Sequence, residues 1–124
     1  MADPYTIKHV DDFEVMEGSG NSTWRLARRT LGADALGFNV VDVAPGGQIP
    51  AHNEAESNQQ EVFVILEGEG TILAGEDEHP APAGTFCVYE PETHRGLENR
   101  SDAPVRALLI GVPKDSGYQP QEWT

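Results

Sequence analysis

The sequence predicts an all-β protein, a single antiparallel sandwich or barrel built from short strands. Its 124 residues are enough for one domain with a real core. The 13 Gly and 9 Pro are spread along the whole chain, and between them apolar residues alternate with polar ones in short runs. The periodicity of a long amphipathic helix is absent. We therefore expect many strands joined by tight turns.

Seven segments have the composition of strands, and the breaks between them contain Gly, Pro, Asp or Asn, as turns require. These predicted strands are residues 23–31, 35–43, 60–68, 70–75, 84–90, 94–99 and 104–112. The strand at 60–68 is apolar on both faces, because Phe63 and Ile65 alternate with Val62 and Val64. One face must line the interior, and the other must pack on a second sheet or a second subunit. His79 falls in a break and is expected in an exposed turn.

The pattern divides the chain into an N-terminal arm at 1–23, a barrel at 24–113 and a polar tail at 114–124. The arm is acidic and rich in Gly and Ser toward its end, so we expect an arm or an edge strand rather than core. The tail contains Tyr118 and Trp123, which are predicted to latch it onto the barrel.

The charge of the chain argues against two classes of partner. Asp and Glu outnumber Lys and Arg 21 to 8, a formal net charge of −13, which repels nucleic acid and anionic membrane surfaces. We therefore expect no nucleic acid and no membrane partner. The single cysteine, Cys87, cannot form an internal disulfide, and its apolar surroundings favour a packed side chain. The start of the sequence does not look like a signal peptide, so a cytoplasmic location is expected.

Residues 46–68 carry a spaced motif. Gly46 is followed after five residues by His52, and Glu61 is followed after six residues by Gly68. This resembles the first motif of the cupin superfamily, and the resemblance extends over residues 24–113. There are two departures: Glu54 stands where the family has a second histidine, and six residues separate it from Glu61.

A second, weaker match covers residues 84–99, where Gly84 and Asn99 mark its ends and Pro91 lies one place late. His94 precedes the family's histidine position by one residue, and a gap-free alignment places Arg95 there. The resemblance implies a double-stranded β-helix (jelly-roll) barrel and a homodimer. It also implies a divalent metal (Fe, Mn, Ni or Zn) held inside the barrel by histidine and glutamate side chains.

Strand parity tests which residues enter the barrel. His52 and Glu54 have the same parity, and Glu61 points to the same side of its strand as Phe63. In the predicted strand 94–99, an inward Leu97 takes Arg95 with it and turns His94 outward. A β-bulge would reverse that assignment.

The two arrangements imply different sites. With His94 inward, the metal ligands are His52, Glu54, Glu61 and His94, a set suited to Fe, Mn or Zn. With Arg95 inward, its guanidinium replaces the ion and pairs with a carboxylate. The ligand pocket is then predicted to consist of six residues: His52, Glu54, Glu61, Phe63, Arg95 and Leu97.

Three functions are compatible with these residues. Binding of a small molecule, such as a carbohydrate or an organic acid, or of a weakly held metal ranks first. A metal-dependent oxygenase, isomerase or decarboxylase is the alternative, and a purely structural or regulatory barrel is the third.

Overall fold

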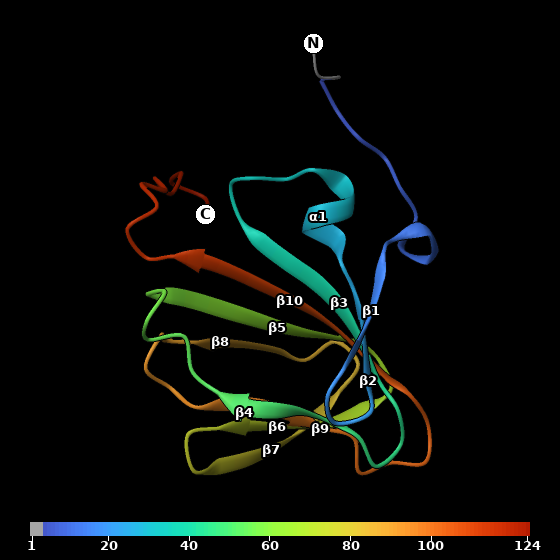
Figure 1. The fold of residues 1–124 in the computed structure, drawn as a ribbon. Helices are drawn as coiled ribbons and strands as arrows, with labels where there is room; N and C mark the ends of the chain where they lie inside the picture. The colour runs from blue at the N-terminus through green and yellow to red at the C-terminus, as the bar shows by residue number, and fades with distance from the viewer. Residues whose placement is uncertain (1–3) are drawn as a thin grey trace.

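The computed structural model describes residues 4–124; the predicted arm also includes residues 1–3, which lie outside this range. Within it, two antiparallel sheets face each other (Figure 1), with six strands in the order β1-β2-β3-β10-β5-β8 and four in the order β4-β9-β6-β7. The strands are β1 (Val15–Gly18), β2 (Ser22–Arg25), β3 (Gly37–Val43), β4 (Gln48–His52), β5 (Gln59–Glu67), β6 (Glu69–Ala74), β7 (Asp77–Pro82), β8 (Phe86–Tyr89), β9 (Arg95–Glu98) and β10 (Val105–Pro113). A 3-10 helix, η1 (Val10–Asp12), and a short helix, α1 (Ala27–Leu31), precede β3. The predicted all-β jelly-roll barrel is confirmed.

The core lies between the two sheets and is formed by the inward positions of alternating strands. On β5, Phe63 and Ile65 are fully buried, and on β9 so is Leu97. Phe63 packs edge-on against Tyr89 of β8, with ring centroids 4.9 Å apart, a favourable aromatic geometry. The remaining members of this cluster are Val41, Val43, Ile49, Ile72, Ala81, Val105, Ala107 and Leu109.

The N-terminal region departs from the predicted strand at 23–31. Its first part is strand β2, which pairs with β1 and β3 and so extends the large sheet. Its second part is helix α1, which packs against β3 (Figure 1). The helix ends at Gly32, whose φ of 75° provides a left-handed C-cap. Local helix propensity at 27–31 and this glycine stop explain the error.

The break expected around His79 is instead strand β7, and the segment before His52 forms strand β4. The prolines are the reason that β7 was not predicted, because Pro80 and Pro82 have no backbone N–H to donate a hydrogen bond to a neighbouring strand. β7 is an edge strand that pairs with β6 alone, so it tolerates them. His79 is nevertheless exposed, as expected.

The tail does not latch onto the barrel through its aromatic residues. Tyr118 and Trp123 remain 69% and 83% exposed, so that prediction is wrong. The outer face of the large sheet also leaves apolar side chains in solvent: Phe86 and Val88 on edge strand β8 are 70% and 59% exposed. The homodimer stays a prediction.

Candidate functional site

Three glycines place the turns on which the site depends. Gly46, Gly68 and Gly84 have φ angles of 77°, 83° and 95°, in the left-handed region that favours glycine. These are the glycines of the two sequence motifs. Their spacing therefore reflects backbone turns at the ends of strands, which fix the positions of β4, β5 and β8.

Three side chains of the first motif converge at one end of the barrel. His52 ends β4 in the small sheet, Glu54 follows in the next loop, and Glu61 lies on β5 in the large sheet. His52 Nε2 lies 3.4 Å from Glu54 Oε1 and 3.9 Å from Glu61 Oε1. One potential ligand atom from each of the three lies within 4.8 Å of the others. We call these three residues the His/Glu cluster.

The conformation of the loop between Glu54 and Glu61 explains how Glu54 reaches the cluster, although this loop is longer than in the cupin motif. The Glu54 amide donates to the Pro91 carbonyl at 2.9 Å, which ties the loop to the β8–β9 turn. Ser57 Oγ donates to Glu54 Oε2 at 2.9 Å, so the loop also fixes the carboxylate. Asn58, with a φ of 52°, makes the turn into β5. The extra residues therefore form a compact turn and leave the Glu54 carboxylate next to His52.

Arg95 is buried in the barrel, as the strand parity of Leu97 predicts. Its side chain is 0% exposed, and its Nη1 donates to Glu61 Oε1 at 3.1 Å. Its Nη2 donates to the Glu90 carbonyl at 2.6 Å, and Nε donates to the Thr93 carbonyl at 3.2 Å. The guanidinium carbon also lies 5.0 Å from the Tyr89 ring centroid, a cation–π distance.

His94 points away from this site. It is exposed, and Arg95 pairs with Ala74 and Leu97 with Ile72 of β6 in continuous register. The register shift against β4 places its extra residue on β4, between Ile49 and His52, and leaves the alternation of β9 unchanged. The predicted metal set of His52, Glu54, Glu61 and His94 is therefore brought together only in its first three members. Strand parity, which allows one of two adjacent residues to face inward, excludes the fourth.

Glu61 is the electrostatic centre of the site. Its side chain is 12% exposed. Burial raises the pKa of Glu61 above its usual value of 4.5 and outweighs the opposing ion pair with Arg95. The charge of Glu54 raises the pKa of Glu61 and His52 lowers it, both by less than burial and Arg95. A buried carboxylate with one cationic partner remains able to accept hydrogen bonds from a ligand.

A cavity of about 450 Å³ opens beside the His/Glu cluster. Phe63, Arg95 and Leu97, predicted for the pocket, do not line it, because they are packed into the core beneath it. The prediction missed the wall contributed by the N-terminal region, including Trp24 and Arg28. The Leu31-Gly32 helix stop was the signal that could have placed Arg28 on a helix. The lining residues are Met16, Trp24, Leu26, Arg28, Arg29, Gly37, Phe38, Asn39, His52, Glu54, Gln59, Glu61, Leu109 and Gly111.

The His/Glu cluster fits a divalent cation in its donor types. His52 Nδ1 lies 3.0 Å from the Pro50 carbonyl, which can only accept, so Nδ1 carries the proton. The Nε2 lone pair then faces two carboxylates, and imidazole nitrogen with carboxylate oxygen is a donor set that Fe, Mn, Ni and Zn accept. Arg95 already supplies one positive charge to Glu61, so the cluster offers less net negative charge to an ion than its two carboxylates alone.

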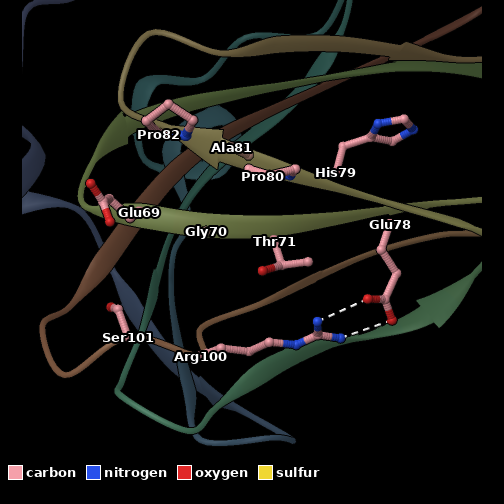
Figure 2. A pocket seen from close by; sticks show the side chains of 10 residues that line it. All are labelled: Glu69, Gly70, Thr71, Glu78, His79, Pro80, Ala81, Pro82, Arg100 and Ser101. Carbon is pink, nitrogen blue, oxygen red and sulfur yellow. Dashed lines mark hydrogen bonds and ion pairs between the residues drawn. The ribbon is translucent and has the colours of Figure 1, made fainter.

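A second hollow, of about 580 Å³, lies against β6 and β7 on the small sheet (Figure 2). Its arginine is already paired: Arg100 forms two hydrogen bonds with Glu78, at 2.8 and 2.9 Å, and also pairs with Glu98. His79 points away from that ion pair in Figure 2. The cationic group of this hollow is therefore already engaged within the protein.

Solved structures with the same fold were found in several bacteria. A cupin protein from Bacteroides fragilis has a TM-score of 0.78 at 18% identity, over 99% of this chain and 95% of that one. A predicted oxalate decarboxylase from Thermotoga maritima has a TM-score of 0.76 at 17% identity, over 87% and 99%. A sugar phosphate isomerase from Silicibacter pomeroyi has a TM-score of 0.74 at 20% identity, over 88% and 76%. At these identities the likeness shows the fold alone.

No curated protein matches the sequence. Within residues 4–124, no helix is long and apolar enough to cross a membrane. The model of the cupin domain matches residues 39–111, which span strands β3 to β10 and contain both the His/Glu cluster and Arg95. With the jelly-roll barrel and the two motifs in place, the chain belongs to the cupin family.

Proposed function

We propose that this protein binds a small polar molecule, such as a carbohydrate or an organic acid, in the cavity beside the His/Glu cluster. The observation that carries the proposal is the convergence of three polar side chains, from two sheets and a loop, on one cavity. A concave site with a few fixed polar groups among apolar walls is typical of small-molecule recognition. The carboxylates accept hydrogen bonds from hydroxyl groups, and His52 orients the same groups.

Arg95 is not available to a ligand, because its guanidinium is fully engaged within the protein. Its guanidinium is enclosed by Glu61, the Tyr89 ring and backbone carbonyls. A ligand could reach it only by displacing the Glu61 ion pair. Arg95 therefore supports the site by holding Glu61 and is not counted among the contacts to the ligand.

Binding is tested by calorimetric titration with monosaccharides and hydroxy acids. We expect saturable binding by the wild type and a loss of about tenfold in Glu54→Gln, which removes the charge on one acceptor and weakens its hydrogen bond. The matched control is Glu92→Gln, an exposed position outside the cavity lining. Equal affinity in both variants would refute the role of the cluster.

A second candidate function is a metal-dependent enzyme of the oxygenase, isomerase or decarboxylase type. The observation in its favour is that His52 Nε2 faces both carboxylates, so His52, Glu54 and Glu61 would hold the ion. An Fe, Mn, Ni or Zn ion would polarise a bound oxygen atom of the substrate. The side chains would position the ion, and Arg95 would hold Glu61 in its ligating orientation.

Elemental analysis of untagged protein tests this second candidate. A near-stoichiometric metal content that disappears in His52→Ala but persists in His79→Ala would support it, since His79 is exposed on another edge of the barrel. Absence of metal from the wild type, together with no binding of added Zn²⁺ or Mn²⁺ in calorimetry, would refute it. Small-molecule binding would stand in either case.

A further inference from the structure

Arg28 differs from the other arginines of this acidic chain. Five of the six arginines have a carboxylate within 4 Å among the described residues, and Arg28 is the sixth. Its Nη1 donates to the Ala33 carbonyl at 3.2 Å, which uses one of five N–H donors. In a chain with 21 acidic residues, an arginine without a carboxylate partner is free to meet an anion from outside. The paired arginines are Arg25 and Arg106 with Asp42, Arg29 with Glu14, Arg95 with Glu61, and Arg100 with Glu78 and Glu98.

Arg28 lines the same cavity as the His/Glu cluster. It comes from α1, which packs against β3, whereas the cluster comes from β4, its following loop and β5. Trp24 of β2 and Leu109 of β10 also line this cavity and give it an apolar wall. The cavity thus has a basic group and an acidic group supplied by different parts of the chain.

We propose that the ligand carries a carboxylate or phosphate group, which Arg28 binds, and hydroxyl groups, which donate to Glu54 and Glu61. This inference rests on the proposed function and names its ligand class. Ionised carboxylates only accept hydrogen bonds, so they repel an anionic group and attract hydroxyls. Arg28 carries a positive charge and only donates hydrogen bonds, so it attracts an anionic group. Its planar guanidinium matches the geometry of a carboxylate or a phosphate. The two groups fix the direction in which the ligand enters.

The anion-binding group lies outside the segment that the cupin model matches. That segment begins at residue 39, after α1 has ended at Leu31. The barrel supplies the acidic group of the cavity, and the N-terminal region adds the basic group. Ligand class is therefore set by a part of this chain that the shared barrel does not specify.

Calorimetric titration with two matched probe pairs tests the inference. Ribose 5-phosphate is compared with ribose, and gluconate with glucose, so that each pair differs in its anionic group and the two pairs separate phosphate from carboxylate. We expect at least one anionic probe to bind about tenfold tighter than its neutral partner, with a preference that weakens as salt is added. Arg28→Gln should reduce the preference to about threefold or less.

Lys8→Gln is the matched control, because it removes the same charge from an exposed residue outside the cavity lining. It should leave the preference unchanged, and Arg28→Lys should restore part of it. Equal binding of neutral and anionic probes, or a preference that survives in Arg28→Gln, overturns the role of Arg28 and leaves the proposed function standing. Binding of neither member of either pair overturns both.

Discussion

Replacing Arg95 by methionine tests the central structural claim about the site. Methionine keeps most of the aliphatic stem and removes the guanidinium. The substitution leaves Glu61 without its cationic partner and deprives the Glu90 and Thr93 carbonyls of donors. Arg95 is 0% exposed and Glu61 is 12% exposed, so the carboxylate meets water only where it lines the cavity, and not on the side from which the guanidinium is removed.

The expected loss of unfolding free energy is about 3–5 kcal/mol, the usual cost of breaking a buried ion pair from one side. Most of it comes from the stranded charge of Glu61, so Glu61→Gln in the same chain should recover part of the loss. A double-mutant cycle with the two single variants isolates this coupling. The coupling should be favourable and comparable with the cost of an unpaired buried charge.

Urea unfolding followed by fluorescence of the two tryptophans measures these differences. The control is Arg100→Met, which removes an arginine that has two carboxylate partners but is 51% exposed. Exposed pairs contribute little, so the control should be far less destabilised. If Arg95→Met costs no more than Arg100→Met, Arg95 is not a buried partner of Glu61, and the description of the site fails.

Three further predictions concern the fold around the site. Burial opposes the ionisation of Asp42, but hydrogen bonds from its two arginine partners outweigh it and lower the pKa of Asp42 below 3.8. Its contribution is therefore present above pH 3.8 and lost as pH falls through the lower folded value, so Asp42→Asn should cost about 1 kcal/mol near pH 7 and progressively less in acid, measured by unfolding across pH. Gly68→Ala should cost about 2–3 kcal/mol, because the new Cβ meets the Pro104 carbonyl in a left-handed backbone; Gly75→Ala, with a similar φ and open space, should cost less, and equal melting temperatures would contradict the clash. If the predicted homodimer forms through the outer face of the large sheet, Phe86→Lys should lower the molar mass measured by light scattering, whereas a monomeric wild type would rule the homodimer out.

The barrel and its inward residues could be predicted because strand periodicity has only two phases. Once Leu97 is assigned to the core, Arg95 must face inward and His94 outward, and the structure shows this arrangement. The glycines of the two motifs likewise lie at turns with positive φ in the structure. Local rules of this kind need no knowledge of what lies across the barrel.

Features that depend on contacts between distant segments could not be predicted. The proline-rich strand β7 is tolerated because it lies at a sheet edge, a position that no local pattern indicates. Arg28 reaches the cavity because α1 packs on β3, and the exposure of Tyr118 depends on how the tail lies against the barrel. Phe63 and Leu97 face inward as predicted, but they lie below the floor of the cavity and do not line it.

The ion pair between Arg95 and Glu61 joins strand β9 of the small sheet to strand β5 of the large sheet. It acts as a strut across the barrel at the base of the cavity. A deeper cavity would require removal of this ion pair, so any gain in volume for a larger ligand would be accompanied by a loss of stability. The side-chain bonds of α1 stay within the N-terminal region, from Arg28 to Ala33 and from Arg29 and Thr30 to Glu14, so among the described residues α1 carries no such link between the sheets. Selection or design for a different ligand is therefore directed to the rim of the barrel, where size and charge can change while the two sheets stay clamped.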